Sequence, residues 1–202
     1  MKRNWLGRLE YRFGDWAFPQ LALFIVAMNG AVYILSMAKP EFYAMLHLDP
    51  RLVLSGQVWR LFTPMFIHFG LIHLLFNMLW LKDLGSAIER RHGIVKFIAM
   101  VLVISALSNL GQYLVAGPSF GGMSGVVFGL LGYIWMRGKF DPSSGFRLPK
   151  SIVIMMGIWF IICFVGIIPG IANTAHAVGL GLGMLFGFVS SGRLGKLFDR
   201  SG

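Results

Sequence analysis

The sequence contains little charge, few acidic residues and almost no cysteine. Charged residues make up 13% of the chain, against about 25% in ordinary soluble domains, and this scarcity excludes a water-soluble globule. Apolar residues make up 56%, which excludes a disordered chain. The single cysteine, Cys163, excludes a disulfide framework and a zinc cluster built on thiolates. At 202 residues the chain has the length of one domain, so we expect a single membrane domain over residues 1–202.

Long apolar runs are what the sequence has instead. A helix needs about 20 apolar residues to cross a bilayer, and six runs approach or reach that length. They cover Phe18–Ala38, Leu71–Glu89, Phe97–Val115, Ser124–Met136, Ile152–Ile168 and Asn173–Val189. The sequence therefore predicts an all-α integral membrane protein with a six-helix core over residues 18–189. A signal peptide ending near Ala38 is the weaker interpretation of the first run, which is longer than a usual signal-peptide core.

Basic residues are distributed unevenly around these runs. Most of them precede the first run, follow the sixth, or stand between the second and third or the fourth and fifth. They are Lys2, Arg3, Arg8, Arg12, Arg90, Arg91, Lys96, Arg137, Lys139, Arg147, Lys150, Arg193, Lys196 and Arg200. Because lysine and arginine mark cytoplasmic segments, we expect both termini to be cytoplasmic, residues 1–17 as a short N-terminus and residues 190–202 as a tail. The net charge of +10 then matches an anionic membrane surface rather than nucleic acid.

The segment between the first two runs, residues 39–70, is unusually rich in large apolar side chains for a solvated loop. They include Trp59, Phe62, Met65, Phe66 and Phe69. Because exposed aromatic side chains favour a surface that buries them, this long loop is predicted to form short amphipathic helices in the outer membrane interface.

Polar residues occur where three of the six runs begin. His73 and Asn77 stand near the start of the second run, Ser124 at the start of the fourth, and Asn173 and His176 at the start of the sixth. In the predicted topology these three runs all begin on the outer side, so the side chains lie at a similar depth. Polar groups are costly inside a bilayer, and their convergence indicates a functional site.

Ser124 lies within a glycine-rich turn, Gly121–Gly125, of the kind that exposes a nucleophile at the start of a helix. The alternative is a serine bonded to its own helix within a small-residue packing face. The run from Ser124 to Met136 spans only about 20 Å as a helix, whereas the hydrocarbon core is about 30 Å thick. Ser124 is therefore predicted to lie below the outer surface, in a wet, protein-lined depression that suits hydrolysis.

His176 has the position and chemistry of a general base for that serine. Gly179 and Gly183 give its helix a face that allows close packing, and Gly125 and Gly129 give the fourth run a matching face. Packing of the two faces brings the imidazole within reach of the hydroxyl, where it can accept the proton and return it to a leaving amine. The alternative is a buried neutral histidine bonded to a carbonyl.

Acidic residues that would orient this histidine, as in a catalytic triad, are scarce. Asp141 is the only one between Glu89 and Asp199. The residues therefore predict a Ser–His dyad, unless Glu41 or Asp49 of the long loop reaches the imidazole.

His73 and Asn77 are four residues apart and share one helix face. Both can donate hydrogen bonds to a developing oxyanion, together with the N–H of Ser124. The alternative role is hydrogen bonding between helices. His68, five residues earlier, is expected only to tune access or water.

These segments together resemble the rhomboid intramembrane serine proteases, in particular their compact bacterial type. The resemblance extends over residues 58–189. It is carried by Trp59-Arg60, His68 to Asn77, Gly85, Glu89-Arg90, the Gly121–Gly125 turn, and Ala175-His176 followed by Gly179 and Gly183. It implies a six-helix rhomboid bundle, with Arg60 and Glu89 as structural partners of the loops.

The resemblance also implies roles for single residues. Ser124 would be the nucleophile and His176 the general base, with an oxyanion hole made by His73, Asn77 and the Ser124 amide. Supporting roles fall to Gly122, Gln112, Phe128 and Asn173, with Gln112 helping to hold water. A substrate gate would be formed by Phe76, Trp80, Met155 and Trp159, which the residues alone predict only to face lipid. Phe128 stands where the family usually has a tyrosine, so it can stack on the histidine but lacks a hydroxyl.

The expected function is therefore cleavage of peptide bonds in or near the transmembrane segments of membrane proteins. Its partners would be transmembrane substrates and the lipid bilayer, with no nucleic acid, metal or cofactor; no His-Glu-x-x-His motif occurs in the sequence. We expect a bacterial inner membrane, with the site opening to the non-cytoplasmic side. A catalytically weak or inactive relative that binds transmembrane helices is the alternative. A transporter would need a charged path, for which only Lys82 and Asp83 qualify.

Overall fold

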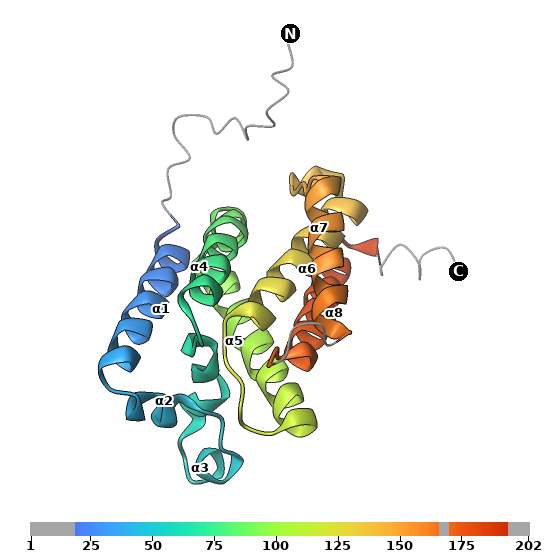
Figure 1. The fold of residues 1–202 in the computed structure, drawn as a ribbon. Coiled ribbons are helices and arrows are strands. Elements are labelled where there is room, and N and C mark those ends of the chain that lie inside the picture. The colour runs from blue at the N-terminus through green and yellow to red at the C-terminus, as the bar shows by residue number, and fades with distance from the viewer. Residues whose placement is uncertain (1–18, 166–169, 194–202) are drawn as a thin grey trace.

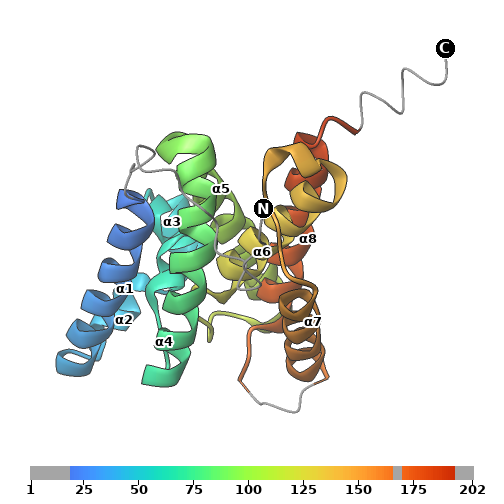
Figure 2. The ribbon, with the colours of Figure 1, turned by 90° about the horizontal axis from the view of Figure 1, so that it is seen from above.

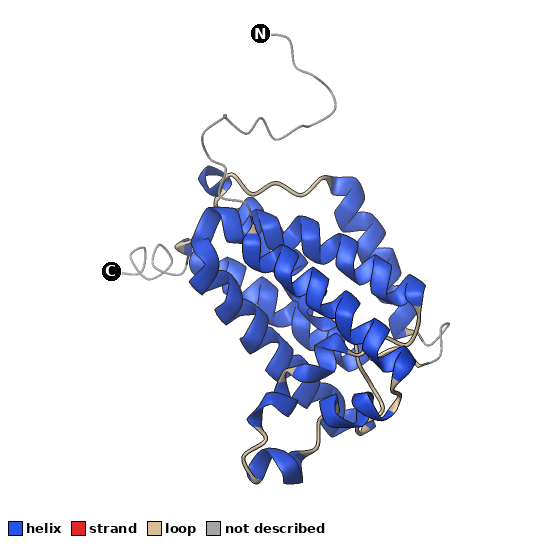
Figure 3. Ribbon diagram, turned by 90° about the vertical axis from the view of Figure 1, so that its left-hand side faces the viewer, coloured by secondary structure: helices blue, strands red, loops and turns tan. Residues whose placement is uncertain are grey.

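The computed structural model describes residues 19–165 and 170–193. α6 lies in the middle of the bundle, with α1 and α4 to one side and α7 and α8 to the other (Figure 1 and Figure 2). The longer helices are α1 (Gln20–Ala38), α4 (Leu71–Trp80), α5 (Ser86–Ala116), α6 (Ser124–Phe140), α7 (Lys150–Phe164) and α8 (Asn173–Ser190). A π-helical turn, η3 (Leu81–Gly85), joins α4 to α5. No strand occurs in the described residues (Figure 3), so the all-α prediction is confirmed.

The predicted apolar runs correspond to these helices. α5 is interrupted at Gly93, whose left-handed φ of 78° divides the stretch Leu71–Ala116 into two helical arms that match the second and third runs. α6 continues beyond its predicted end, to Phe140. α7 ends at Phe164, before the predicted end of the fifth run, and residues 166–168 of that run lie outside the described residues.

Two helical stretches of the described chain are long and apolar enough to cross a membrane, Gln20–Ala38 and Leu71–Ala116, and α7 is a shorter apolar helix. This agrees with an integral membrane protein. The number of crossings and the side of each terminus stay predictions. The basic residues before Phe18 and after Arg193, on which part of the topology prediction depends, lie outside the described residues.

The contact between α6 and α8 is made by glycines. Every residue of α6 from 125 to 134 is buried. A methyl group added to Gly179 would overlap the carbonyl oxygen of Gly125, and one added to Gly183 would overlap that of Gly129. The predicted pairing of the two glycine faces is therefore confirmed. Because no side chains intervene, the two backbones are in van der Waals contact, and dispersion along this glycine seam stabilises the helix pair.

The segment between α1 and α4 contains four short helices, as predicted. They are α2 (Glu41–Leu46), α3 (Pro50–Leu54), η1 (Val58–Leu61) and η2 (Thr63–Phe66). Trp59 and Phe69 are exposed, whereas Met65 is buried in the main core, because η2 packs against α1 and α6. The position of these helices in the membrane interface stays a prediction.

Two buried charged side chains fix the loop and α1. The Arg60 guanidinium donates hydrogen bonds to the carbonyls of Ala44 (3.0 Å) and His47 (2.8 Å), which holds α2 against η1. The Glu89 carboxylate accepts hydrogen bonds from two backbone N–H groups in the first turn of α1 (2.9 and 2.7 Å). Those N–H groups have no acceptor within their own helix, so Glu89 supplies the missing partner with a favourable charge.

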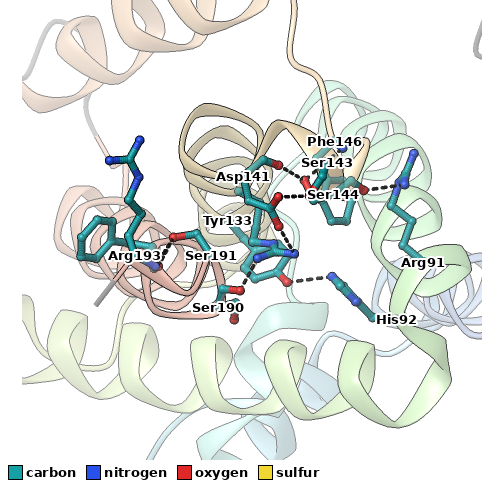
Figure 4. A network of polar contacts seen from close by, with 12 residues as sticks. Arg91, His92, Tyr133, Asp141, Ser143, Ser144, Phe146, Ser190, Ser191 and Arg193 are labelled. Atoms are coloured by element: carbon teal, nitrogen blue, oxygen red, sulfur yellow. Dashed lines mark hydrogen bonds and ion pairs between the residues drawn. The ribbon is translucent and has the colours of Figure 1, made fainter. Parts of the chain in front are cut away.

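A second polar network lies at the C-terminal end of α6 (Figure 4). It connects α5 and the C-terminal end of α8 to α6 and to the loop that leads to α7. Arg91 of α5 donates to two consecutive carbonyls of that loop (2.6 and 2.8 Å). Arg137 of α6 pairs with Asp141 (2.9 Å) and donates to the Ser190 carbonyl at the end of α8. The Ser143 hydroxyl and the Arg137 guanidinium lower the pKa of Asp141, so the pair stays ionised at neutral pH.

The glycine seam makes a sharp prediction for α8. Gly183→Ala places a methyl group against the backbone of α6, and we expect it to lower the melting temperature in detergent by at least about 5 °C. Gly181→Ala is the matched control, because a methyl group there meets no atom within 4 Å. We expect that variant to melt within about 2 °C of the unmodified protein, since alanine is the better helix former. Equal losses for both variants would show that the seam does not determine stability.

Candidate active site

Ser124 is the first residue of α6, and the backbone before it is held by the segment that precedes α4. Gly122 has a left-handed φ of 118°, and its N–H donates to the carbonyl of Pro64 (3.0 Å). The next amide, that of Met123, donates to Nε2 of His68 (3.4 Å). Because the first N–H groups of a helix have no acceptor within it, the Ser124 N–H is available to a ligand at this position.

His176 lies in the first turn of α8, and its Nε2 is 2.7 Å from Oγ of Ser124. The imidazole is buried, and its Nδ1 has no hydrogen-bond partner among the described residues. Neither loop acid reaches it: Asp49 instead caps α3 and accepts a hydrogen bond from the N–H of Arg51 (2.9 Å). An imidazole nitrogen at this distance can take the proton of a hydroxyl that attacks a carbonyl carbon.

Three further predicted residues surround His176. The Phe128 ring lies against the imidazole, with 4.8 Å between ring centroids and 38° between the planes. Oε1 of Gln112 accepts a hydrogen bond from the N–H of Ala175 (3.1 Å), which fixes the backbone next to the histidine. Asn173 begins α8 one turn before His176, and its Oδ1 is buried with no partner in the described part of the chain. Packing and backbone hydrogen bonds therefore hold the imidazole where an acid would otherwise do so.

His73 and Asn77, both on α4, lie on the other side of the serine turn. A methyl group added to Gly122 would lie 2.8 Å from Nε2 of His73 and 3.8 Å from Oγ of Ser124, so this imidazole is in contact with the turn. The buried side-chain amide of Asn77 donates to the carbonyl of His73, one turn earlier in the same helix (2.9 Å). The structure thus brings His73 to the turn that carries the serine, while Asn77 stands one helical turn further along α4 with one N–H already engaged.

The four residues of the expected gate lie on α4 and α7. The ring centroid of Phe76 is 5.8 Å from that of Trp159 on α7 and 6.2 Å from that of Trp80. Met155 is 45% exposed. The fully buried side chains of α7 are only those of Met156 and Cys163, so a few aromatic contacts hold this helix to its neighbours.

α5 carries a buried polar face that was not predicted from the sequence. Asn109 donates to the carbonyl of Leu61 (2.9 Å) and Ser105 to that of Phe62 (3.3 Å), so this face binds the segment that carries η1 and η2. Ser108 lies between them and touches the first turn of α6. The signal was present: these residues and Gln112 recur at i, i+3, i+4 and i+7 within an apolar run, the spacing of one helix face.

Known proteins with similar sequences identify the family. The model of the rhomboid domain matches residues 55–193. The chain is 44% identical over 144 residues to the Rhomboid protease GlpG of Salmonella choleraesuis (strain SC-B67), and 43% identical over 144 residues to the proteins of the same name from Salmonella paratyphi A and Salmonella newport. Each match covers 71% of this chain and 51% of the relative, so the chain spans about half the length of these curated relatives.

The contact between Gly122 and His73 can be tested with a serine-directed fluorophosphonate. We expect Gly122→Ala to slow the reaction of Ser124 by roughly 100-fold, because the new methyl group displaces the His73 ring and the alanine resists the left-handed backbone. Gly117→Ala is the control: its φ of 75° carries a similar strain, but a methyl group there meets nothing within 4 Å. That variant should react within about threefold of the unmodified protein. A Gly122→Ala protein that reacts at the normal rate would remove His73 from the site.

Proposed function

The chain belongs to the rhomboid family, and we propose that it is an intramembrane serine endopeptidase that hydrolyses peptide bonds in or near the transmembrane segments of membrane proteins. The contact of 2.7 Å between Oγ of Ser124 and Nε2 of His176 carries this proposal. The matched relatives are named rhomboid proteases, which supports the proposal, and the shared region covers about half of their length. No metal or cofactor takes part in the proposed reaction.

In the proposed reaction Ser124 is the nucleophile and His176 the general base. Nε2 of His176 takes the hydroxyl proton as Oγ bonds to the substrate carbonyl carbon, and it returns that proton to the leaving amine. A water molecule then repeats the sequence on the acyl-enzyme. Nδ1 of the imidazole has no hydrogen-bond partner in the described part of the chain, which supports a dyad rather than a triad.

The oxyanion of the tetrahedral intermediate would be bound by the Ser124 N–H, His73 and Asn77. The position of Ser124 at the start of α6 supports this, because its amide needs an external acceptor. The contact of His73 with the serine turn supports it as well. Asn77 keeps a second N–H on its side-chain amide, which can turn to the oxyanion. Four further residues support the site by position, packing or hydrogen bonding: Gly122, Gln112, Phe128 and Asn173.

A transmembrane substrate would enter between α4 and α7, past Phe76, Trp80, Met155 and Trp159. The sparse burial of α7 supports this route, because the ring contact recorded between the two helices is the single one of Phe76 with Trp159 in the described part of the chain. Substrate segments that unwind easily would be preferred, since an intact helix hides its carbonyl carbons from a nucleophile.

We place the protein in a bacterial inner membrane with six crossings, both termini cytoplasmic and the serine opening to the other side. Basic residues of the described chain support this orientation. Arg91, Arg137 and the loop that leads to α7 lie at the end of α6 opposite Ser124, as the positive-inside rule requires of cytoplasmic segments.

The reaction can be tested with the fluorophosphonate and a model transmembrane substrate. We expect one adduct, on Ser124, and at least about a 1,000-fold loss of cleavage in Ser124→Ala and in His176→Ala. Ser119→Ala, an exposed serine of the same loop, should label and cleave normally. Cleavage that survives Ser124→Ala would remove this serine as nucleophile. A folded wild type that neither labels nor cleaves would favour a protein that binds transmembrane helices without cutting them.

The orientation can be tested with single cysteines in a Cys163→Ser background. Ser55 and Ser143 are both exposed and lie in loops at opposite ends of the bundle. An impermeant maleimide added to intact spheroplasts should label Ser55→Cys at once and Ser143→Cys only after the membrane is permeabilised. The reverse pattern would invert the proposed topology.

A further inference from the structure

His68 has no part in the proposed dyad or oxyanion hole, yet it contacts both sides of the site. It lies between η2 and α4 and is only 1% exposed. Its Nε2 accepts the N–H of Met123 (3.4 Å), and its ring centroid is 4.9 Å from that of His73. The Tyr43 hydroxyl donates to the backbone carbonyl of His68 (2.7 Å) and makes no contact with the imidazole that the structure records.

These contacts define the protonation state of the His68 ring. Because Nε2 accepts a hydrogen bond, the ring proton must be on Nδ1, which lies 3.3 Å from the carbonyl of Phe66 and donates to it. Burial, and secondly the nearby charge of His73, lower the pKa of His68 to about 4. At neutral pH the imidazole is therefore uncharged, and its Nε2 lone pair is available to the Met123 amide.

The Met123 amide needs such an acceptor. Met123 is fully buried, and a buried N–H without a partner is destabilising. Gly122, the residue before Met123, has a φ of 118° and no Cβ. Because glycine lacks a Cβ, the peptide group between Gly122 and Met123 can adopt more orientations than it could after any other residue type. Pro64 holds the amide of Gly122 and His68 holds that of Met123, so two consecutive amides are fixed just before the Ser124 amide.

We infer that His68 is a positioning residue for the oxyanion hole, holding the Met123 peptide and the His73 ring in register with Ser124. The inference rests on the proposed function, since it assigns His68 to that reaction. Loss of the imidazole would let the peptide before Ser124 rotate and the His73 ring shift. Both changes misdirect donors that matter most in the transition state, so the loss falls on kcat rather than on KM.

Three substitutions separate the two hydrogen bonds of the ring. The terminal amide of glutamine reaches the position of Nε2, so His68→Gln can still accept from Met123. That of asparagine reaches the position of Nδ1, so His68→Asn can donate to Phe66 but leaves Met123 without its acceptor. His68→Phe fills the space and makes neither bond. Tyr43→Phe is the control for general loosening, because it removes a bond to the His68 backbone and leaves the imidazole intact.

We expect His68→Asn and His68→Phe to lower kcat by roughly 10- to 100-fold with KM within about twofold of wild type. His68→Gln should restore kcat to within about threefold, and Tyr43→Phe should leave it unchanged even where its melting temperature falls. Folded Asn and Phe variants with normal kcat would overturn the inference. A folded Gln variant that loses as much as Asn would also overturn it, because the Met123 acceptor would then be irrelevant.

Nitrogen NMR of the wild-type protein tests the same point without relying on the folding of any His68 variant. With ¹⁵N-labelled histidine, we expect one ring protonated on Nδ1 whose Nε2 shift is that of a hydrogen-bond acceptor. The ring signal is assigned to His68 through couplings that connect the ring protons to the labelled backbone of the same residue. A His68 ring protonated on Nε2, or an imidazolium at pH 7, would overturn the inference. Failure of the proposed function has a different signature, a wild type that forms no adduct on Ser124.

Discussion

The glycine seam between α6 and α8 is the constraint on which the site depends. Ser124 begins α6 and His176 lies in the first turn of α8, so the distance between their side chains is set by the separation of the two helix axes. Two pairs of glycines along the seam leave no side chain to hold the helices apart. A hydrogen bond of 2.7 Å tolerates little displacement, and a proton transfer tolerates less. The glycines that let the two helices pack closely therefore also set the distance between Ser124 and His176.

The long loop between α1 and α4 positions the backbone before Ser124. Asn109 and Ser105 donate to carbonyls at the end of η1, and Arg60 donates to carbonyls around α2, so the loop is anchored on α5 and within itself. Held by these hydrogen bonds, the loop presents Pro64 and His68 as fixed acceptors to the backbone before Ser124. A loop in an apolar setting needs these partners in any case, because unpaired backbone groups are costly there. The hydrogen bonds that stabilise the loop therefore also position the serine turn.

Periodicity and spacing predicted the helices and the glycine pairing from sequence, because both depend on neighbours in the chain or on a repeat of four residues. The pairing of Gly179 with Gly125 is such a case. The contacts of His68 with the Met123 amide and of Asn109 with the Leu61 carbonyl were out of reach, because a backbone partner leaves no mark in the sequence and both partners lie many residues away. Composition did not show which side chains of the loop are buried, and the burial of Met65 follows from the packing of η2 against α1 and α6. Single side chains in irregular loops depend on tertiary contacts.

The missing acid has a consequence for when the proposed dyad becomes reactive. In a triad a carboxylate orients the neutral imidazole before the serine attacks and stabilises the imidazolium that forms during the attack. Here Nδ1 of His176 has no described partner, and Phe128 offers a ring face without a hydroxyl. The positive charge on His176 must then be balanced by the oxyanion itself, a few ångströms away in the same buried site. Proton transfer is thus favourable only while a substrate carbonyl occupies the hole, so the serine stays a hydroxyl until a substrate segment has entered and unwound.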